Sequence, residues 1–296
     1  MKTILTVLSV TMLFLIADAR MYAQDSSEQD STGLPGDNFS LHGALEMFKK
    51  AASPEEFEKL LNTQDNHVNN LDLNEDGDID YVRVVDKSEK DVHAFVLQVS
   101  VSETENQDVA VIELEKTGDE KAILQIVGDE DLYGEQTIVE PYEEGGGDDD
   151  GDAVLDEGHG PYAGAMHVQH ARIIVNVWVW PCVRFVYAPA YVVWVSPWGW
   201  HRHPAWWHPW RPLRWHVFHP LRAHYHHHFR VVHTHRVVHA HRVYTPVRAS
   251  SVTVRTRHHA NVTHYRTTRT TTIHTKAGTA KVKTTRTGTR VGKRKR

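Results

Sequence analysis

Residues 79–127 read IDYVRVVDKSEKDVHAFVLQVSVSETENQDVAVIELEKTGDEKAILQIV, and this stretch decides the fold. Apolar and polar residues alternate within it in four runs, which is the pattern of strands with one buried face. We expect these strands at 79–85, 92–101, 109–114 and 122–127. Short polar separators favour antiparallel pairing of successive strands in a meander. Residues such as Ala110, Ile112 and Leu114 would pack on helices, and the opposite face would meet water.

Two short helices are expected before these strands. Ser40 is a good N-cap for a helix over 41–52, whose apolar residues recur at helical spacing. Ser53 and Pro54 are a cap and a first helical residue, so a second helix should begin there. Residues 40–142 are therefore predicted to be an α+β domain of two short helices and a four-stranded antiparallel meander.

Charge divides the chain into two halves. Residues 1–160 hold all 38 acidic side chains and 10 Lys/Arg, a formal charge of −28, whereas residues 161–296 hold no Asp or Glu and 23 Lys/Arg. Between them, residues 143–160 are rich in Gly and Asp, which predicts a solvated linker. Such asymmetry indicates an electrostatic partner for each half, either the other half or an external polymer.

The first 23 residues have the pattern of a secretory signal peptide. Lys2 precedes an apolar run over 4–16, and small residues follow, with cleavage favoured after Ala23. An uncleaved membrane anchor is the competing interpretation, but the apolar run is short for a span. We expect an exported protein, periplasmic, cell-surface or secreted, with no integral membrane span after cleavage. Residues 24–39 are polar and predicted to be disordered.

Residues 72–80, DLNEDGDID, form a candidate calcium loop. Calcium takes six to eight hard oxygen ligands on a flexible loop, with a glycine at the sharp turn. Gly77 has that place, and Ile79 can anchor the loop to the core. The candidate ligands are Asp72, Asn74, Asp76, Asp78 through its carbonyl, and Asp80. The alternative is an acidic turn that holds no ion.

This loop resembles the EF-hand loop, but the match breaks at position twelve, where Arg83 replaces the bidentate Glu. A strand pattern also follows it in place of a helix. The loop looks more like the D-x-[DN]-x-D-G-x-x-D calcium loops of FG-GAP or integrin-type repeats, whose last Asp leads into a strand. The resemblance implies a weak structural calcium site.

Residues 161–249 are rich in Trp, His and Arg and are β-prone. We expect short strands at 173–180, 183–187 and 191–195, since Pro181 and Pro189 break the apolar run at intervals too short for a membrane helix. All nine Trp residues lie between Trp178 and Trp215. They can either stack on sugars, bases or lipid headgroups or pack as a Trp-rich core, and both interpretations stay open.

A histidine repeat follows, with RVVHTH at 230–235 and RVVHAH at 236–241. In an extended strand alternate side chains share a face, which pairs His233 with His235 and His239 with His241. Imidazole suits Zn²⁺, Cu²⁺ and Ni²⁺. Because this half has no carboxylate to complete a site, we expect a poorly specified metal-binding surface. The alternative is a solvated histidine-rich strand.

The tail over 250–296 is rich in Thr, Arg and Lys and is predicted to be disordered until it meets an anionic surface. In layout the chain resembles uncharacterised exported proteins of Bacteroidota-type bacteria. That resemblance rests on MYAQD at 21–25, NNLDLNEDGDIDYVRVVD at 69–86 and YVVWVSPWGW at 191–200.

No catalytic motif of the G-x-S-x-G, H-E-x-x-H or phosphate-loop type is present, so we expect no enzyme. The lone Cys182 excludes an internal disulfide and is expected in the core. The predicted function is a non-catalytic exported binding protein with a calcium-stabilised acidic domain. Its cationic His/Trp/Arg-rich region would bind lipopolysaccharide, polysaccharide or nucleic acid. The alternative is a protein that sequesters Zn²⁺, Cu²⁺ or Ni²⁺ through its histidines.

Overall fold

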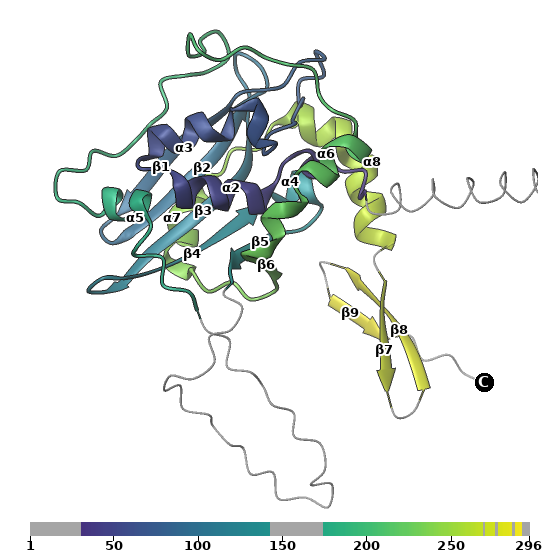
Figure 1. Ribbon diagram of the computed structural model, residues 1–296. Coiled ribbons are helices and arrows are strands. Elements are labelled where there is room, and N and C mark those ends of the chain that lie inside the picture. The colour runs from purple at the N-terminus through teal and green to yellow at the C-terminus, as the bar shows by residue number, and fades with distance from the viewer. Residues whose placement is uncertain (1–30, 143–173, 269, 276–277, 286–287, 292–296) are drawn as a thin grey trace, which may run out of the picture.

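The computed structural model describes residues 31–142 and 174–291, except 269, 276–277 and 286–287. The signal peptide at 1–23 and the linker at 143–160 lie outside these residues. Within the described part, the prediction of helices combined with an antiparallel sheet is confirmed (Figure 1). No helix there is both long enough and apolar enough to cross a membrane.

One sheet of six strands, in the order β1-β2-β3-β4-β5-β6, forms the centre of the molecule. All neighbouring strands in it are antiparallel. The strands are β1 (Val82–Glu89), β2 (Val92–Ser100), β3 (Asn106–Gly118), β4 (Lys121–Gly128), β5 (Thr137–Pro141) and β6 (Phe229–Val232). The first four lie in the predicted meander region, with shifted ends, and the last two were not predicted.

Strand β6 joins the two halves of the chain. It comes from the region after the linker, yet Phe229 pairs with Pro141 and Val232 pairs with Ile138 of β5. The interpretation of 40–142 and 161–249 as separate units is therefore corrected: they share one sheet. The physical reason is that β6 pairs the backbone groups that β5 would otherwise leave unpaired at a sheet edge.

Two helices cover one face of the sheet, α2 (Leu41–Lys50) and α3 (Pro54–Leu61). The Ser40 and Ser53 hydroxyls accept hydrogen bonds from backbone N–H groups in the first turns of α2 and α3. The ring of Phe48 lies 5.2 Å from both Phe57 and Phe95, so helices and strand meet through aromatic packing.

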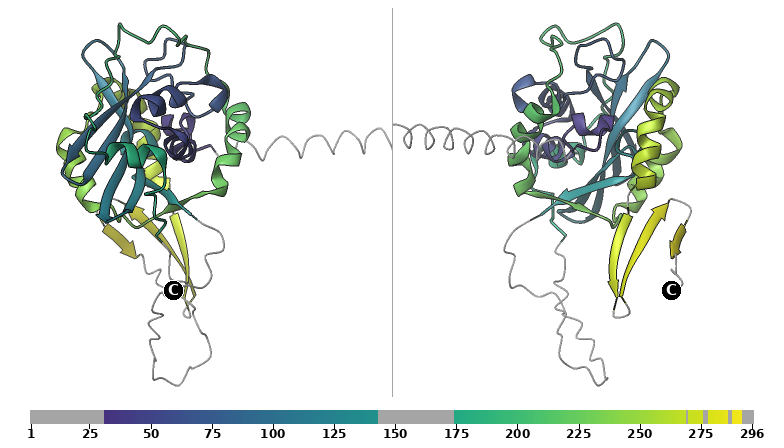
Figure 2. Two further views of the ribbon diagram at one scale, coloured as in Figure 1. Left: turned by 60° about the vertical axis from the view of Figure 1, so that its left-hand side comes forward. Right: turned by 90° about the vertical axis from the view of Figure 1, so that its right-hand side faces the viewer.

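The opposite face is also covered, contrary to the expectation that it meets water. Val96, Val111 and Val127 form a second buried cluster with Tyr244, which belongs to α7 (Val238–Tyr244). Figure 2 shows the purple helices α2 and α3 on one side of the sheet and the yellow-green helix α7 on the other. The sequence missed this cover because α7 comes from the other half of the chain.

The expected strands at 173–180, 183–187 and 191–195 are wrong. Pro181 begins a short helix, α5 (Pro181–Val186), which turns Cys182, Val183 and Val186 into the core. Val195 makes only an isolated bridge to Val85. Burial raises the pKa of the Cys182 thiol, in agreement with its expected place in the core.

The prediction of a disordered tail over 250–296 is wrong for the described residues, because α8 (Val252–Thr268) begins there, and residues 292–296 lie outside the described part. Val254 is fully buried, and the Arg257 and Arg266 guanidinium groups donate to the carbonyls of Leu73 and Gly134. The helix is thus held by polar anchors more than by apolar area. Three strands follow it in a separate antiparallel sheet, β7 (Thr270–Thr275), β8 (Gly278–Thr285) and β9 (Gly288–Val291).

The predicted disorder over 24–39 is also wrong from residue 31 onward, since Leu34 is buried beside η1 (Pro35–Asn38). The remaining elements are η2 (Gln64–Asn66), α4 (Glu130–Tyr133), α6 (Trp215–Leu221), η3 (Ala223–His227) and η4 (Thr245–Val247).

Candidate functional site

The acidic loop 72–80 is a compact turn in which the side-chain oxygens of Asp72, Asn74 and Asp76 accept backbone hydrogen bonds from within the loop. Asp72 accepts hydrogen bonds from the backbone N–H groups of Asp76, at 3.1 Å, and Gly77, at 3.0 Å. Asn74 and Asp76 accept from N–H groups two residues further on. Gly77 has φ +90°, the left-handed conformation that favours glycine. All the predicted calcium-loop residues are thus brought into one turn that leads towards β1.

Asp80 is the buried member of this group. Its side chain accepts a hydrogen bond from the Leu73 N–H, and only 7% of the residue is exposed. Burial, together with the nearby carboxylates of Asp72 and Asp76, raises the pKa of Asp80 to about 7, and the hydrogen bond from the Leu73 N–H opposes this shift. Burial also raises the pKa of Asp72. A cation would relieve both the desolvation and the mutual repulsion of these groups.

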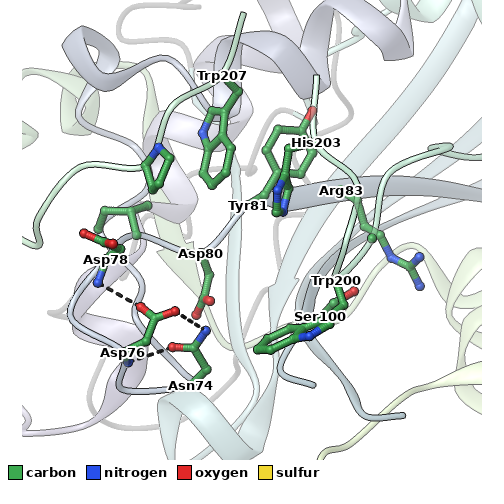
Figure 3. A pocket seen from close by; sticks show the side chains of 13 residues that line it. Asn74, Asp76, Asp78, Asp80, Tyr81, Arg83, Ser100, Trp200, His203 and Trp207 are labelled. Carbon is green, nitrogen blue, oxygen red and sulfur yellow. Dashed lines mark hydrogen bonds between the residues drawn. The ribbon is translucent and has the colours of Figure 1, made fainter. Parts of the chain in front are cut away.

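A pocket of about 270 Å³ lies between this loop and the Trp-rich segment (Figure 3). One wall carries Asn74, Asp76, Asp78 and Asp80, and the other carries aromatic side chains that include Trp200, His203 and Trp207. The Ile79 N–H donates to the Trp210 carbonyl at 2.8 Å, so the C-terminal half also fixes the loop. Ile79 itself is buried, as an anchor should be.

Buried carboxylates are the feature that sequence reasoning missed. They lie in the acidic half and accept hydrogen bonds from donors of the basic half, which has no carboxylate of its own. Glu58 on α3, for example, accepts from the Ser196 hydroxyl at 2.9 Å and from the Trp194 indole at 3.3 Å. The other such residues are Asp86, Asp108, Glu113, Glu115, Asp129 and Glu140.

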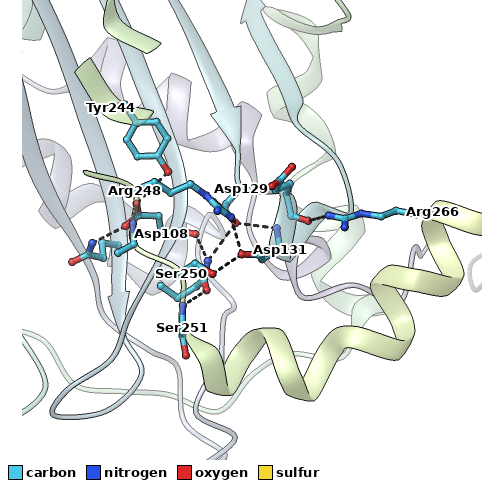
Figure 4. A network of polar contacts seen from close by, with 12 residues as sticks. Asp108, Asp129, Asp131, Tyr244, Arg248, Ser250, Ser251 and Arg266 are labelled. Carbon is cyan, nitrogen blue, oxygen red and sulfur yellow. Dashed lines mark hydrogen bonds and ion pairs between the residues drawn. The ribbon is translucent and has the colours of Figure 1, made fainter. Parts of the chain in front are cut away.

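Figure 4 shows one part of this network, around Asp129. Arg248 forms ion pairs with both Asp129 and Asp131, and the Tyr244 hydroxyl donates to Asp108. Burial raises the pKa of Asp108 to about 6. It also raises the pKa of Asp129, and the contact with Arg248 opposes that shift. Ion pairs and hydrogen bonds between buried carboxylates of the acidic half and donors of the basic half therefore hold the two halves of the chain together.

The histidine repeat is not one extended strand. His233 and His235 lie in the loop after β6, whereas His239 and His241 lie on α7. His233 is exposed, and His239 contacts Glu115. His235 and His241 instead meet at Glu113, with their ring centroids 4.3 Å apart. The predicted pairing within each repeat is wrong, because the chain turns into a helix between the two repeats.

Glu113, His235 and His241 form a cluster that can hold a metal ion. One ligand atom from each lies within 4.8 Å of the other two. Glu113 on β3 is fully buried, His241 Nδ1 lies 2.7 Å from Glu113 Oε1, and His235 Nε2 contacts Glu113 Oε2. The Glu113 hydrogen bond raises the pKa of His241. The missing carboxylate thus comes from the other half, 122 residues before His235.

A comparison of the chain with protein-family models, with curated proteins and with solved structures gives no match. The resemblance to exported Bacteroidota-type proteins and to EF-hand or FG-GAP-type loops therefore stays a prediction.

Proposed function

We propose that this protein is a non-catalytic exported binding protein whose C-terminal half takes up an anionic polymer or an anionic envelope surface. Lipopolysaccharide, an acidic polysaccharide and nucleic acid all offer the required repeating negative charge. The acidic loop acts as a structural calcium site on the same molecule.

The observation that carries this proposal is a set of arginines left over after the two halves have paired. Arg230 and Arg236 form ion pairs with Glu140. Arg248 forms ion pairs with Asp129 and Asp131. Six others are exposed and form no ion pair with any carboxylate in the described part of the chain. They are Arg184, Arg202, Arg211, Arg214, Arg242 and Arg255. Each can neutralise one negative group of a polymer and release its counterion.

Tryptophan accompanies these cations. The Arg202 guanidinium lies 6.0 Å from the Trp198 ring centroid, and Trp206 is 44% exposed. Trp180 and Trp207 are buried, so the segment uses some of its rings for packing and leaves others at the surface. The half-buried Trp198 ring beside Arg202 and the exposed Trp206 ring, which has Lys59 over it, suit sugars or bases that carry phosphate, sulfate or carboxylate groups.

The test is binding of the full chain to heparin, a soluble sulfated polymer, over a salt titration. Affinity should fall steeply with salt, because counterion release drives binding. The double variant Arg211→Ala/Arg214→Ala should weaken binding and reduce the slope of log affinity against log salt by roughly 1 to 2. Lys87→Ala/Lys90→Ala removes the same charge from the exposed end of the β1–β2 hairpin and should change neither quantity.

Equal losses in the two double variants would show that net charge, not this surface, binds the polymer. Salt-independent binding, or none, would contradict the proposal.

The calcium role has its own measurement. Calcium should raise the melting temperature of the full chain, because an ion bound only to the folded state stabilises it. Asp76→Ala should remove this shift. A wild-type transition that neither calcium nor EDTA moves would identify the loop as a turn without an ion.

A further inference from the structure

We propose that Glu113, His235 and His241 form a defined site for one divalent transition-metal ion, with Zn²⁺ as the best match. The inference goes beyond polymer binding and does not depend on it. It replaces a diffuse surface of histidines with three named ligands.

The geometry suits a small ion held by two nitrogens and one oxygen. Zn²⁺ binds imidazole nitrogen and carboxylate oxygen at about 2.0–2.2 Å, so tetrahedral ligand atoms are about 3.3 Å apart. His241 Nδ1 and Glu113 Oε1 are 2.7 Å apart, and all three ligand atoms lie within 4.8 Å of one another. Entry of the ion therefore needs only a small opening of the cluster, and the ion replaces the protons shared by these groups.

The charge of the site also favours a cation. Glu113 is fully buried on the sheet, and the imidazoles of His235 and His241 lie against its carboxylate. Glu115 lies two residues along the same strand and adds a second carboxylate to this face. A divalent ion at Glu113 would compensate the buried charge directly.

Neighbouring residues hold the ligands in place. Glu115 accepts hydrogen bonds from the backbone N–H groups of His239, at 2.5 Å, and Ala240, at 2.9 Å, and so fixes the start of α7. Gln125 accepts from the Arg236 N–H at 2.7 Å, next to His235. Glu115 and Gln125 are thus positioning residues, and such support is typical of metal sites.

The donor set indicates the class of metal. Two imidazoles and one carboxylate suit Zn²⁺ and its neighbours Cu²⁺, Ni²⁺ and Co²⁺, whereas Ca²⁺ takes oxygen ligands only. His235 and His241 keep 22% and 28% of their side chains exposed, which gives an ion access from solvent. Three protein ligands leave a fourth position for water or an external donor.

The experiment is a competition between the full chain and a chromophoric chelator for Zn²⁺. The wild type should hold one tightly bound ion per chain. His235→Gln and His241→Ala should each lower the affinity of that site by at least tenfold, since each removes a direct ligand. His233→Ala is the matched control: it removes an exposed histidine of the same repeat and should leave the tight site unchanged.

A second measurement reports the coordination itself. Co²⁺ in place of Zn²⁺ should give the intense visible absorption of a four-coordinate site, and Glu113→Gln should abolish it. Melting curves in EDTA show whether each variant is folded. If Glu113→Gln does not fold, the loss of the Co²⁺ absorption is measured with His235→Gln instead. Equal losses for His233→Ala and His235→Gln would identify a diffuse histidine surface and overturn the proposal. Unchanged affinity in the ligand variants would overturn it as well.

Discussion

The two faces of the central sheet are closed by different forces. Towards α2 and α3 the contacts are largely apolar, with Phe48, Phe57 and Phe95 fully buried, although the buried Glu58 of α3 also accepts hydrogen bonds there. On the opposite face a short apolar cluster is accompanied by carboxylates such as Glu113 and Asp129, which bind donors from the C-terminal half. The first face draws its stability from excluded water, which salt changes little. The second depends on ionisation, so salt and pH should change it.

The comparison also explains the charge pattern of the chain. Side-chain donors of the half without acidic residues bind to buried carboxylates of the other half. In the described part of the chain, each half therefore supplies charged partners for the other.

The largest expected effect is on the apolar face. Phe95→Ala removes a buried ring of β2 that packs against Phe48 of α2 and should lower the free energy of unfolding by about 3–5 kcal/mol. Chemical denaturation measures the loss, which should be the same at low and high salt. A loss that shrinks markedly in high salt would break the distinction between the two faces.

The next effect is on the charged face. Asp129→Ala removes an ion-pair partner of Arg248 and the side chain that caps α4. The free energy of unfolding should fall by about 2 kcal/mol. The value stays below that of fully buried pairs because 28% of the Arg248 side chain is exposed. Asp129→Asn is the control, since it can keep the cap and loses only the charge. The loss of stability in Asp129→Ala should diminish as the salt concentration rises, unlike that in Phe95→Ala.

A smaller effect is expected on the pH dependence of stability, which should differ between the two faces of the sheet. The raised pKa of Asp108, about 6, means that its folded form holds a proton more tightly than its unfolded form. Its contribution to stability is therefore complete below about pH 4 and is lost as pH rises through about 6. Asp108→Asn should flatten this part of the stability profile by about 1 kcal/mol, whereas the Phe95→Ala profile should stay parallel to wild type. Thermal melts between pH 4.5 and 8 provide the measurement.

The smallest effect sets the baseline for surface charge. Lys50 lies 3.2 Å from Glu46 on α2, and its side chain is 58% exposed. Lys50→Ala should change the free energy of unfolding by less than about 0.5 kcal/mol. A loss comparable with that of Asp129→Ala would mean that burial is not what distinguishes the ion pairs across the sheet.

Local signals predicted what is contiguous in the chain. Ser53 and Pro54 start α3 as expected, and the acidic loop gathers its residues within one turn, because both depend on neighbours a few residues apart. The alternation around Ile112 predicted β3 but not the partner of its polar face. Charged residues on a predicted strand were taken as solvated, although a cationic half elsewhere in the chain offered them partners.

The histidine cluster was out of reach for a different reason. The repeat at 230–241 fits an alternating strand by composition, and only the cover of the sheet decides that its second part is helical. Val237, Ala240 and Tyr244, all buried, recur at helical spacing and were the available signal. Nothing local connects Glu113 with His241, which lie 128 residues apart in the chain.

The position of strand β6 late in the chain has a consequence for folding during synthesis. Synthesis delivers the chain from its N-terminus, so β1 to β5 emerge long before β6 and α7, and Glu113 precedes His235 by 122 residues. During that interval the nascent sheet presents an anionic face and an unpaired edge at β5, the kind of surface on which premature association begins. The last third of the polypeptide therefore closes the sheet that the first half leaves open, and a ribosome that stops early releases an incomplete sheet.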